Sequence, residues 1–161
     1  IDTNNFMAKT GVRTFEAAAY LRRNGADMTR VRKMLRENMQ AYKARAEVVR
    51  NAEVYRDTFA ISVCDSSNLE SPTVVGAQAA NELLDITGIK ASFVLTDFQK
   101  KIYISARSID EIDVQMIMER MGGGGHLNFA GAQIEGKTIE EVTAEIRELL
   151  DRLIEEGEIV L

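Results

Sequence analysis

The feature that most constrains this chain is a run of four glycines, Gly122 to Gly125, followed directly by the only histidine, His126. Ordering a glycine on folding costs more backbone entropy than ordering any other residue, so an ordinary loop has no use for four in a row. Such a run suits a place where the backbone approaches another group closely and presents its N–H groups. The sequence therefore predicts a loop that holds a phosphate-rich ligand, because amide N–H groups and an imidazole both donate to anionic oxygens.

The position of the glycine run excludes two common phosphate-binding loops. The pattern over residues 113–121 predicts a short helix that ends at the glycines, whereas a Walker A loop and a dinucleotide-binding fingerprint both follow a strand and open a helix. The run also lacks the Lys-Ser or Lys-Thr pair of a Walker A loop. A helix C-cap needs only one glycine, so capping alone does not explain four.

The composition is that of a globular protein with one real core in 161 residues. The net charge of −5 argues against non-specific binding to duplex nucleic acid, although it allows a local basic pocket. Cys64 follows the apolar run 59–63 and is expected to be a buried, unreactive thiol in a reducing compartment. The sequence has no apolar run long enough for a membrane span and no signal peptide, which favours the cytoplasm. Its start, residues 1–6, reads as part of a longer protein.

Hydrophobic periodicity predicts an α-helical N-terminal arm over residues 1–52 and a mixed-sheet α/β sandwich over residues 53–161. In the arm, a helix over 15–23 precedes one long amphipathic helix that is capped by Asp27 or Thr29 and runs to Val49. The elements expected in the second part, in chain order, are strands over 54–55 and 59–63, a polar loop over 65–73 that includes Pro72, a helix over 74–86, strands over 91–95 and 102–106, a helix over 113–121, a helix opened by the Thr138 capping box, and an edge strand over 159–161.

Three residues outside the glycine run are candidates for chemistry. Arg107 leaves the end of the strand over 102–106, where ligand sites of α/β proteins tend to lie, and its planar guanidinium suits a phosphate. A surface arginine paired with an aspartate would give the same pattern, and Ser108 would equally cap the turn into the next helix. Asp2 follows a residue that can end a strand, but one carboxylate does not hold a catalytic metal.

The sequence GGGGHLNFAGA, residues 122–132, resembles the GGGGHxxAAG signature of the DHH-associated domain, subfamily 1, of DHH phosphoesterases. Residues 105–108, Ser-Ala-Arg-Ser, resemble the companion Arg-Ser motif of that family. Residues 1–18 resemble the end of the DHH catalytic domain, and residues 12–27 look most like the GdpP-type cyclic-di-AMP phosphodiesterases. Phe129 departs from the pattern, since the signature often has alanine there.

The resemblance implies that this chain is the substrate-binding half of the enzyme. Backbone N–H groups of the glycine run would approach the base and the phosphate, while an arginine and the histidine would stabilise phosphate charge. The residues that the resemblance assigns to substrate binding are Arg107, Ser108, Gly123, Gly124, Gly125 and His126.

The resemblance also implies that catalysis depends on residues outside this chain. Asp2 would be the last metal-binding aspartate of an Asp-Thr pair, but the Asp-His-His triplet that names the family is absent. Manganese would therefore be held mainly by an upstream DHH catalytic domain, and the fragment alone is expected to be inactive.

The resemblance leaves several functions open. The first is the C-terminal part of a cyclic-di-AMP phosphodiesterase that yields pApA. A second is a hydrolase of short oligoribonucleotides (nano-RNA) of the same superfamily, and a third is an RNA-binding module like that of alanyl-tRNA synthetases. Whether the protein is a homodimer is also open. Because GdpP-type proteins carry an N-terminal membrane anchor, this domain would lie on the cytoplasmic side.

Overall fold

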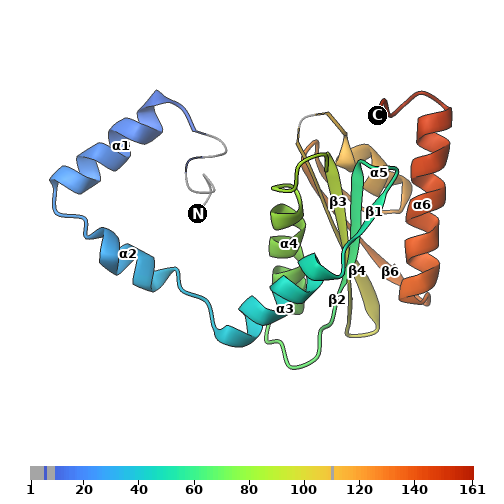
Figure 1. The fold of residues 1–161 in the computed structure, drawn as a ribbon, viewed down its shortest axis with the longest axis horizontal. Coiled ribbons are helices and arrows are strands. Elements are labelled where there is room, and N and C mark those ends of the chain that lie inside the picture. The colour runs from blue at the N-terminus through green and yellow to red at the C-terminus, as the bar shows by residue number, and fades with distance from the viewer. Residues whose placement is uncertain (1–5, 7–9, 110) are drawn as a thin grey trace. The chain divides into compact units, whose positions relative to one another are not determined.

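The computed structural model describes residue 6, residues 10–109 and residues 111–161. These fall into two compact units, Ile1–Glu37 and Asn38–Leu161 (Figure 1). The division comes earlier than the predicted boundary between residues 52 and 53. The reason is that the helix preceding residue 52 packs within the second unit, as described below.

The first unit contains two helices, α1 (Val12–Arg23) and α2 (Met28–Met34). The predicted helix over 15–23 is confirmed and begins three residues earlier, at Val12. Asp27 is the N-cap of α2, and its carboxylate accepts a hydrogen bond of 2.9 Å from the Thr29 N–H. Neither helix contains a buried residue.

The single long helix expected between Asp27 and Val49 is wrong, because the chain forms two helices there. After α2 ends, α3 (Met39–Arg50) begins at a new cap, where the Asn38 side chain accepts a hydrogen bond of 2.8 Å from the Ala41 N–H. Asparagine side chains compete in this way with a continuous helix, even where the apolar spacing runs on. Val48 of α3 is 1% exposed and belongs to the core of the second unit.

The second unit is built on a six-stranded sheet with the strand order β1-β2-β3-β4-β6-β5. Strands β2 and β3 are parallel, and the other neighbours are antiparallel, which confirms the predicted mixed sheet. The strands are Glu53–Tyr55 (β1), Phe59–Cys64 (β2), Ala91–Phe98 (β3), Lys101–Ser108 (β4), Gly124–His126 (β5) and Phe129–Glu135 (β6).

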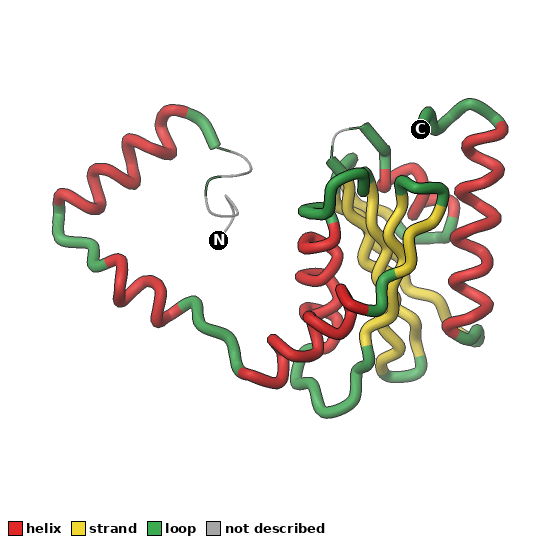
Figure 2. Tube along the Cα trace, viewed as in Figure 1, coloured by secondary structure: helices red, strands yellow, loops and turns green. Residues whose placement is uncertain are grey.

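Helices cover both faces of the sheet, which appears as a layer between them in Figure 2. On one face α4 (Pro72–Leu83) packs on β2, β3 and β4, and α3 packs on α4. On the other face α5 (Val114–Arg120) and α6 (Ile139–Glu155) enclose the larger core. The predicted α/β sandwich is therefore confirmed. None of the helices in the described residues is both long and apolar enough to cross a membrane.

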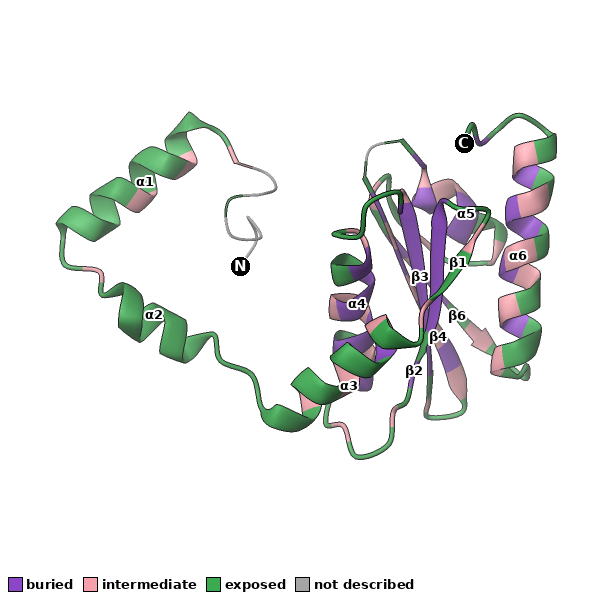
Figure 3. Cartoon of the chain, viewed as in Figure 1, coloured by how far each residue is buried: buried purple, intermediate pink, exposed green. Residues whose placement is uncertain are grey.

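The central strand β3 is buried along most of its length (Figure 3), whereas burial along β4 follows the two-residue alternation of a strand. The residues of β4 that point to α5 and α6 are buried, namely Ile102, Ile104, Ala106 and Ser108. The half-buried residues between them point to the α4 face of the sheet: Lys101, Tyr103, Ser105 and Arg107. This alternation decides which side chains can meet at the functional site.

Two further details differ from the sequence prediction. Residues 159–161 form no strand; instead the Ile159 N–H donates to the Leu153 carbonyl (3.1 Å), and the Ile159 side chain, 5% exposed, closes the core at the end of α6. Pro72 was expected in a loop but lies in the first turn of α4, a position at which its missing N–H costs nothing.

The predicted Thr138 capping box is present at the start of α6. The Thr138 N–H donates to Glu141 (2.8 Å), and the Glu141 N–H donates to Thr138 (3.2 Å).

Candidate functional site

The first glycine of the run ends helix α5. Gly122 has φ +78°, and its N–H donates to the Glu119 carbonyl (3.0 Å), while the Gly123 N–H donates to the Met118 carbonyl (2.8 Å). These two bonds form a Schellman motif, which satisfies carbonyls at the helix end and favours glycine at the left-handed position. One glycine of the four is therefore explained by capping, as the sequence argument allowed.

Two other glycines let β5 lie against β6 at very short range. A Cβ on Gly123 would lie 2.1 Å from the Gly131 carbonyl oxygen, and one on Gly125 would lie 2.3 Å from the Phe129 carbonyl oxygen. Gly131 is constrained in turn, since its Cβ would lie 2.7 Å from the Ile104 carbonyl oxygen of β4. The last two glycines of the run, Gly124 and Gly125, thus belong to the edge strand of the sheet, where the sequence predicted a loop.

Gly124 is the exception in the run. A Cβ at this position would meet nothing within 4 Å, and its φ is not in the left-handed region. It pairs with Gly131, so two residues without side chains lie next to each other on β5 and β6. The result is a patch of bare backbone at the sheet edge, where a ligand can come close to main-chain atoms.

The strand register brings the predicted residues into rows on the α4 face. Directly paired residues of antiparallel strands point to the same face. Arg107 of β4 pairs with Phe129 of β6, which pairs with His126 of β5, and this arrangement makes one row. The next row is Ser105, Gly131 and Gly124. Arg107, His126 and the open glycine therefore share one face of the sheet.

The Arg107 side chain is held by two carbonyls and an aromatic ring, but not all of its hydrogen-bond donors have an acceptor. Its Nη1 donates to the Ala106 carbonyl (2.8 Å) and to the Ala130 carbonyl (3.4 Å), and its Cζ lies 5.4 Å from the centre of the Phe129 ring. The buried Nε has no hydrogen-bond partner among the described residues. Burial lowers the pKa of Arg107, which means that its charged form is poorly solvated. A bound anion would accept a hydrogen bond from the guanidinium and would stabilise its positive charge.

A hollow of about 420 Å³ lies beside these rows on the same face. Of the predicted site residues, Gly123 lines it, while Arg107 and His126 lie in the row next to it rather than on its wall. The hollow is lined by Thr73, Tyr103, Ile104, Ser105, Gly122, Gly123, Gly131, Ala132 and Gln133.

Two predicted residues are not brought to this face. Ser108 is one position beyond Arg107 and therefore points to the opposite face, where it is 6% exposed and donates to the Leu127 carbonyl (3.4 Å). Ser108 also donates its N–H to the Asn128 carbonyl (3.2 Å), so that both of its donors hold the turn between β5 and β6. Asp2 lies outside the described residues. Within the described residues, no group of three or more His, Cys, Asp or Glu side chains could hold a metal ion.

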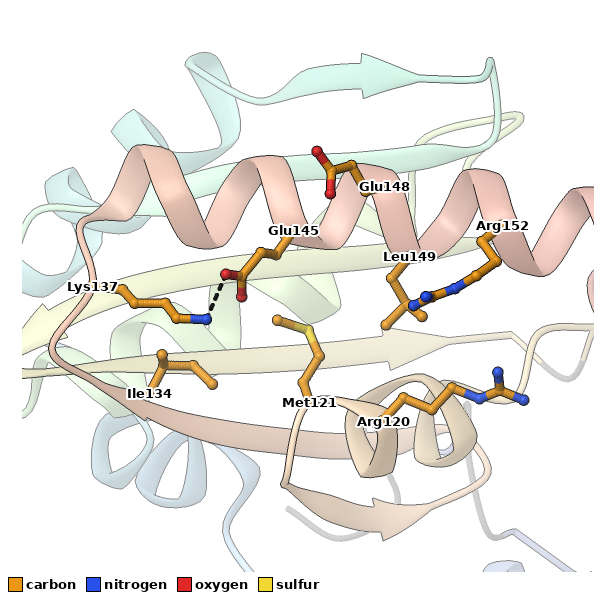
Figure 4. A pocket seen from close by; sticks show the side chains of 8 residues that line it. All are labelled: Arg120, Met121, Ile134, Lys137, Glu145, Glu148, Leu149 and Arg152. Carbon is orange, nitrogen blue, oxygen red and sulfur yellow. Dashed lines mark hydrogen bonds and ion pairs between the residues drawn. The ribbon is translucent and has the colours of Figure 1, made fainter.

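A second hollow, of about 400 Å³, lies between α5, β6 and α6 (Figure 4). Its floor is apolar, with Met121, Ile134 and Leu149 pointing inward. Much of its charge is paired within the protein, since Lys137 contacts Glu145 and Arg120 contacts Glu158. The glycine face is the better candidate for the functional site, because its arginine retains an unused, buried donor.

The predicted site residues do not include four residues of this face: Tyr103, Ser105, Phe129 and Gly131. Ser105 was identified only as part of the Arg-Ser motif, and Phe129 only as a departure from the family signature. Tyr103 and Ser105 alternate with the apolar residues of the strand over 102–106, so their position was available from the alternation alone. Phe129 and Gly131 were not accessible in this way, because the strand that carries them was not predicted.

Comparison with known proteins identifies the family. The DHHA1 domain family matches residues 58–156, which is more than half of the chain. This chain belongs to the DHHA1 domain family. The match includes the sheet from β2 onward and every residue of the glycine face described above, and it confirms the resemblance read from the sequence.

The relatives of this chain include proteins named as cyclic-di-AMP phosphodiesterases. The chain is 43% identical over 152 residues to the cyclic-di-AMP phosphodiesterase PdeA of Listeria monocytogenes, covering 94% of this chain and 23% of that protein. It is 40% identical over 158 residues to the cyclic-di-AMP phosphodiesterase GdpP of Geobacillus thermodenitrificans, covering 98% of this chain and 24% of that protein. The chain therefore spans about a quarter of the length of these relatives.

A solved structure shows the same fold. An exopolyphosphatase-related protein from Bacteroides fragilis superimposes with a TM-score of 0.81 at 22% identity, covering 94% of this chain and 46% of that one. At this identity the likeness concerns the fold alone.

Proposed function

We propose that this DHHA1 chain is the nucleotide-binding part of a cyclic-di-AMP phosphodiesterase whose product is pApA. The observation that carries the proposal is the row of Arg107, Phe129 and His126 beside a glycine strand, in a chain 43% identical to a cyclic-di-AMP phosphodiesterase. The guanidinium and the imidazole supply donors for phosphate oxygens. The bare backbone at Gly124 lets the ligand approach the sheet edge.

We infer that bond cleavage belongs to an upstream DHH catalytic domain. Two-metal phosphodiester hydrolysis requires several carboxylate and imidazole ligands that converge on one point. The described residues contain no such group, and the one histidine lies in the row proposed to bind phosphate. The described residues therefore do not fit a manganese site, and the proposed task of this part of the chain is to hold and orient the nucleotide.

The binding part of the proposal is tested by titrating the 161-residue chain with pApA in a calorimeter. Arg107→Ala should weaken binding by about 1.5–3 kcal/mol, or roughly 10- to 150-fold, which is typical of a charge-assisted hydrogen bond. His126→Ala should also weaken it. Lys101→Ala is the matched control, since Lys101 lies on the same strand and face but is paired with Glu135 (2.8 Å). Unchanged affinity in both site variants would show that the assignment is wrong.

The catalytic part is tested by comparing this chain with a longer protein that includes the upstream domain. Only the longer protein should hydrolyse cyclic-di-AMP with manganese, and Arg107→Ala or His126→Ala should slow it. Hydrolysis by the purified 161-residue chain would overturn the division of labour. Parallel titrations with short oligoribonucleotides and with tRNA separate this function from a nano-RNA hydrolase and from an RNA-binding module.

A further inference from the structure

We propose that the ring of Phe129 is a stacking platform for the base of the bound nucleotide. The proposal rests on the proposed function and adds to it, because it assigns the base to a side chain of this particular sequence. A residue that stacks on the base makes the site select nucleotides over phosphate compounds that have no base.

Phe129 is exposed beside the residues proposed to bind phosphate. Phe129 is 46% exposed although it opens a strand whose next residue, Ala130, is 7% exposed and part of the core. A single exposed apolar side chain needs no explanation on an ordinary surface. Here the ring lies between Arg107 and His126 in the same row, where two groups able to donate to phosphate flank it.

The ring of Phe129 is also held in place by Arg107 in the absence of a ligand. The Arg107 guanidinium carbon is 5.4 Å from the ring centre, and the guanidinium is itself fixed by the Ala106 carbonyl (2.8 Å). A cation above an aromatic face stabilises the pair and limits the rotamers of both side chains. A preorganised platform loses little conformational entropy when a base stacks on it.

Glycines leave space next to the Phe129 ring along β6. The next residue of β6 on the same face is Gly131, and its partner across the strands is Gly124, so neither fills the space beside the ring with a side chain. The hollow of about 420 Å³ begins at Gly131 and continues away from Phe129. A flat base can therefore lie against the ring while the rest of the ligand follows the glycine strand.

Stacking also determines what this residue can discriminate. Every base has a π face, so stacking tolerates different bases and does not read their hydrogen-bonding edges. Phe129 should therefore separate nucleotides from ribose phosphates, and it should separate adenine from guanine only weakly. Arg107 supplies the phosphate contact in both kinds of ligand.

The test is a titration of the 161-residue chain, followed by NMR, with AMP and with ribose 5-phosphate, which differ only in the base. The original chain should bind AMP about 5- to 150-fold more tightly, the range expected for one base stacked on an aromatic ring. Phe129→Leu should lower AMP affinity by about that factor and lower ribose 5-phosphate affinity much less, since only AMP loses the stacked base while both ligands lose the support that the ring gives to Arg107. Phe129→Tyr, which keeps the ring, should retain AMP affinity. Leu127→Ala is the control, since Leu127 is an apolar neighbour that is 48% exposed.

The outcomes separate this inference from the function on which it rests. If Phe129→Leu lowers the affinity for both ligands equally, the ring only positions Arg107, and the stacking proposal is wrong. If Phe129→Leu leaves AMP affinity unchanged while Arg107→Ala still lowers it, the platform is wrong and the phosphate site stands. If the original chain binds neither ligand, both proposals fail. Thermal melting of each variant checks that the fold is intact.

Discussion

The same substitution at two adjacent glycines of the run should affect stability very differently: Gly123→Ala should destabilise the fold, and Gly124→Ala should leave its stability nearly unchanged. At Gly123 the added methyl would lie 2.1 Å from the Gly131 carbonyl oxygen and 2.7 Å from the Ala132 Cα, and both of these are backbone atoms. At Gly124 it would meet nothing within 4 Å. Neither glycine has a left-handed φ, so backbone strain does not complicate the comparison.

The loss of stability in each variant depends on which atoms the added methyl group would displace. Overpacking costs about 1–3 kcal/mol where neighbours can adjust, and at Gly123 the neighbours are backbone, so we expect the upper end, about 3 kcal/mol. The loss of stability cannot exceed the free energy of detaching β5, because a detached strand no longer collides with β6. This strand pairs with β6 through only three residues. For a unit of this size 1 kcal/mol corresponds to roughly 3–5 °C, so Gly123→Ala should lower Tm by about 9–15 °C. Gly124→Ala should stay within about 0.5 kcal/mol, or about 2 °C.

The assay is thermal unfolding followed by circular dichroism, with urea unfolding as a second measure of the free energy of unfolding. A Gly123→Ala variant that melts with the original chain would refute the close approach of β5 to β6. So would a Gly124→Ala variant that loses as much stability as Gly123→Ala. Either result would mean that β5 does not lie where the structure places it.

Two further predictions concern the glycine face and the buried thiol. Gly124→Val should abolish binding of pApA in a calorimetric titration while keeping a normal melt, because its side chain enters the bare patch on the ligand side; undiminished binding would contradict this. Burial raises the pKa of Cys64 above its ordinary value of 9.0, so its contribution to stability is complete below about pH 9 and is lost as pH rises through the folded-state pKa. The thiol should therefore react with a thiol reagent at pH 8 only after unfolding in urea, and rapid reaction of the folded chain would show that Cys64 is not buried.

Elements with local signals were predictable from the sequence. The Thr138 capping box marks the start of α6, Asp113 caps α5 through the Met116 N–H (3.1 Å), and the runs over 91–95 and 102–106 are strands that extend a few residues further. In each case the residues that set the element lie within or beside it.

The features that the sequence prediction missed depend on contacts between distant residues. Glycines have a low preference for strands, and β5 exists because Gly123 and Gly125 have no side chain to collide with β6. The division of the long helix depends on the Asn38 cap, which competes with an otherwise continuous apolar pattern. The formation of β5 and the end of α2 depend on specific contacts and hydrogen bonds, which the spacing of apolar residues does not reveal.

The candidate site was predictable in its residues but not in its geometry. Arg107, His126 and the glycines were identified by residue type and position in the chain. The placement of Arg107 opposite Phe129 requires the register of β4 and β6, and the exclusion of Ser108 follows from the alternation of one strand. Because β6 was not predicted, the ring that contacts Arg107 could not be placed.

The most direct test of the central claim is an NMR titration of the 161-residue chain with pApA, with backbone amide resonances assigned. The account predicts that the largest shift changes lie on β4, β5 and β6, at residues 105–107, 123–126 and 129–131, and that Arg107→Ala reduces them at every ligand concentration. Shift changes centred on the hollow of Arg120, Met121 and Lys137, or no changes at all, would contradict the assignment of nucleotide binding to the glycine face.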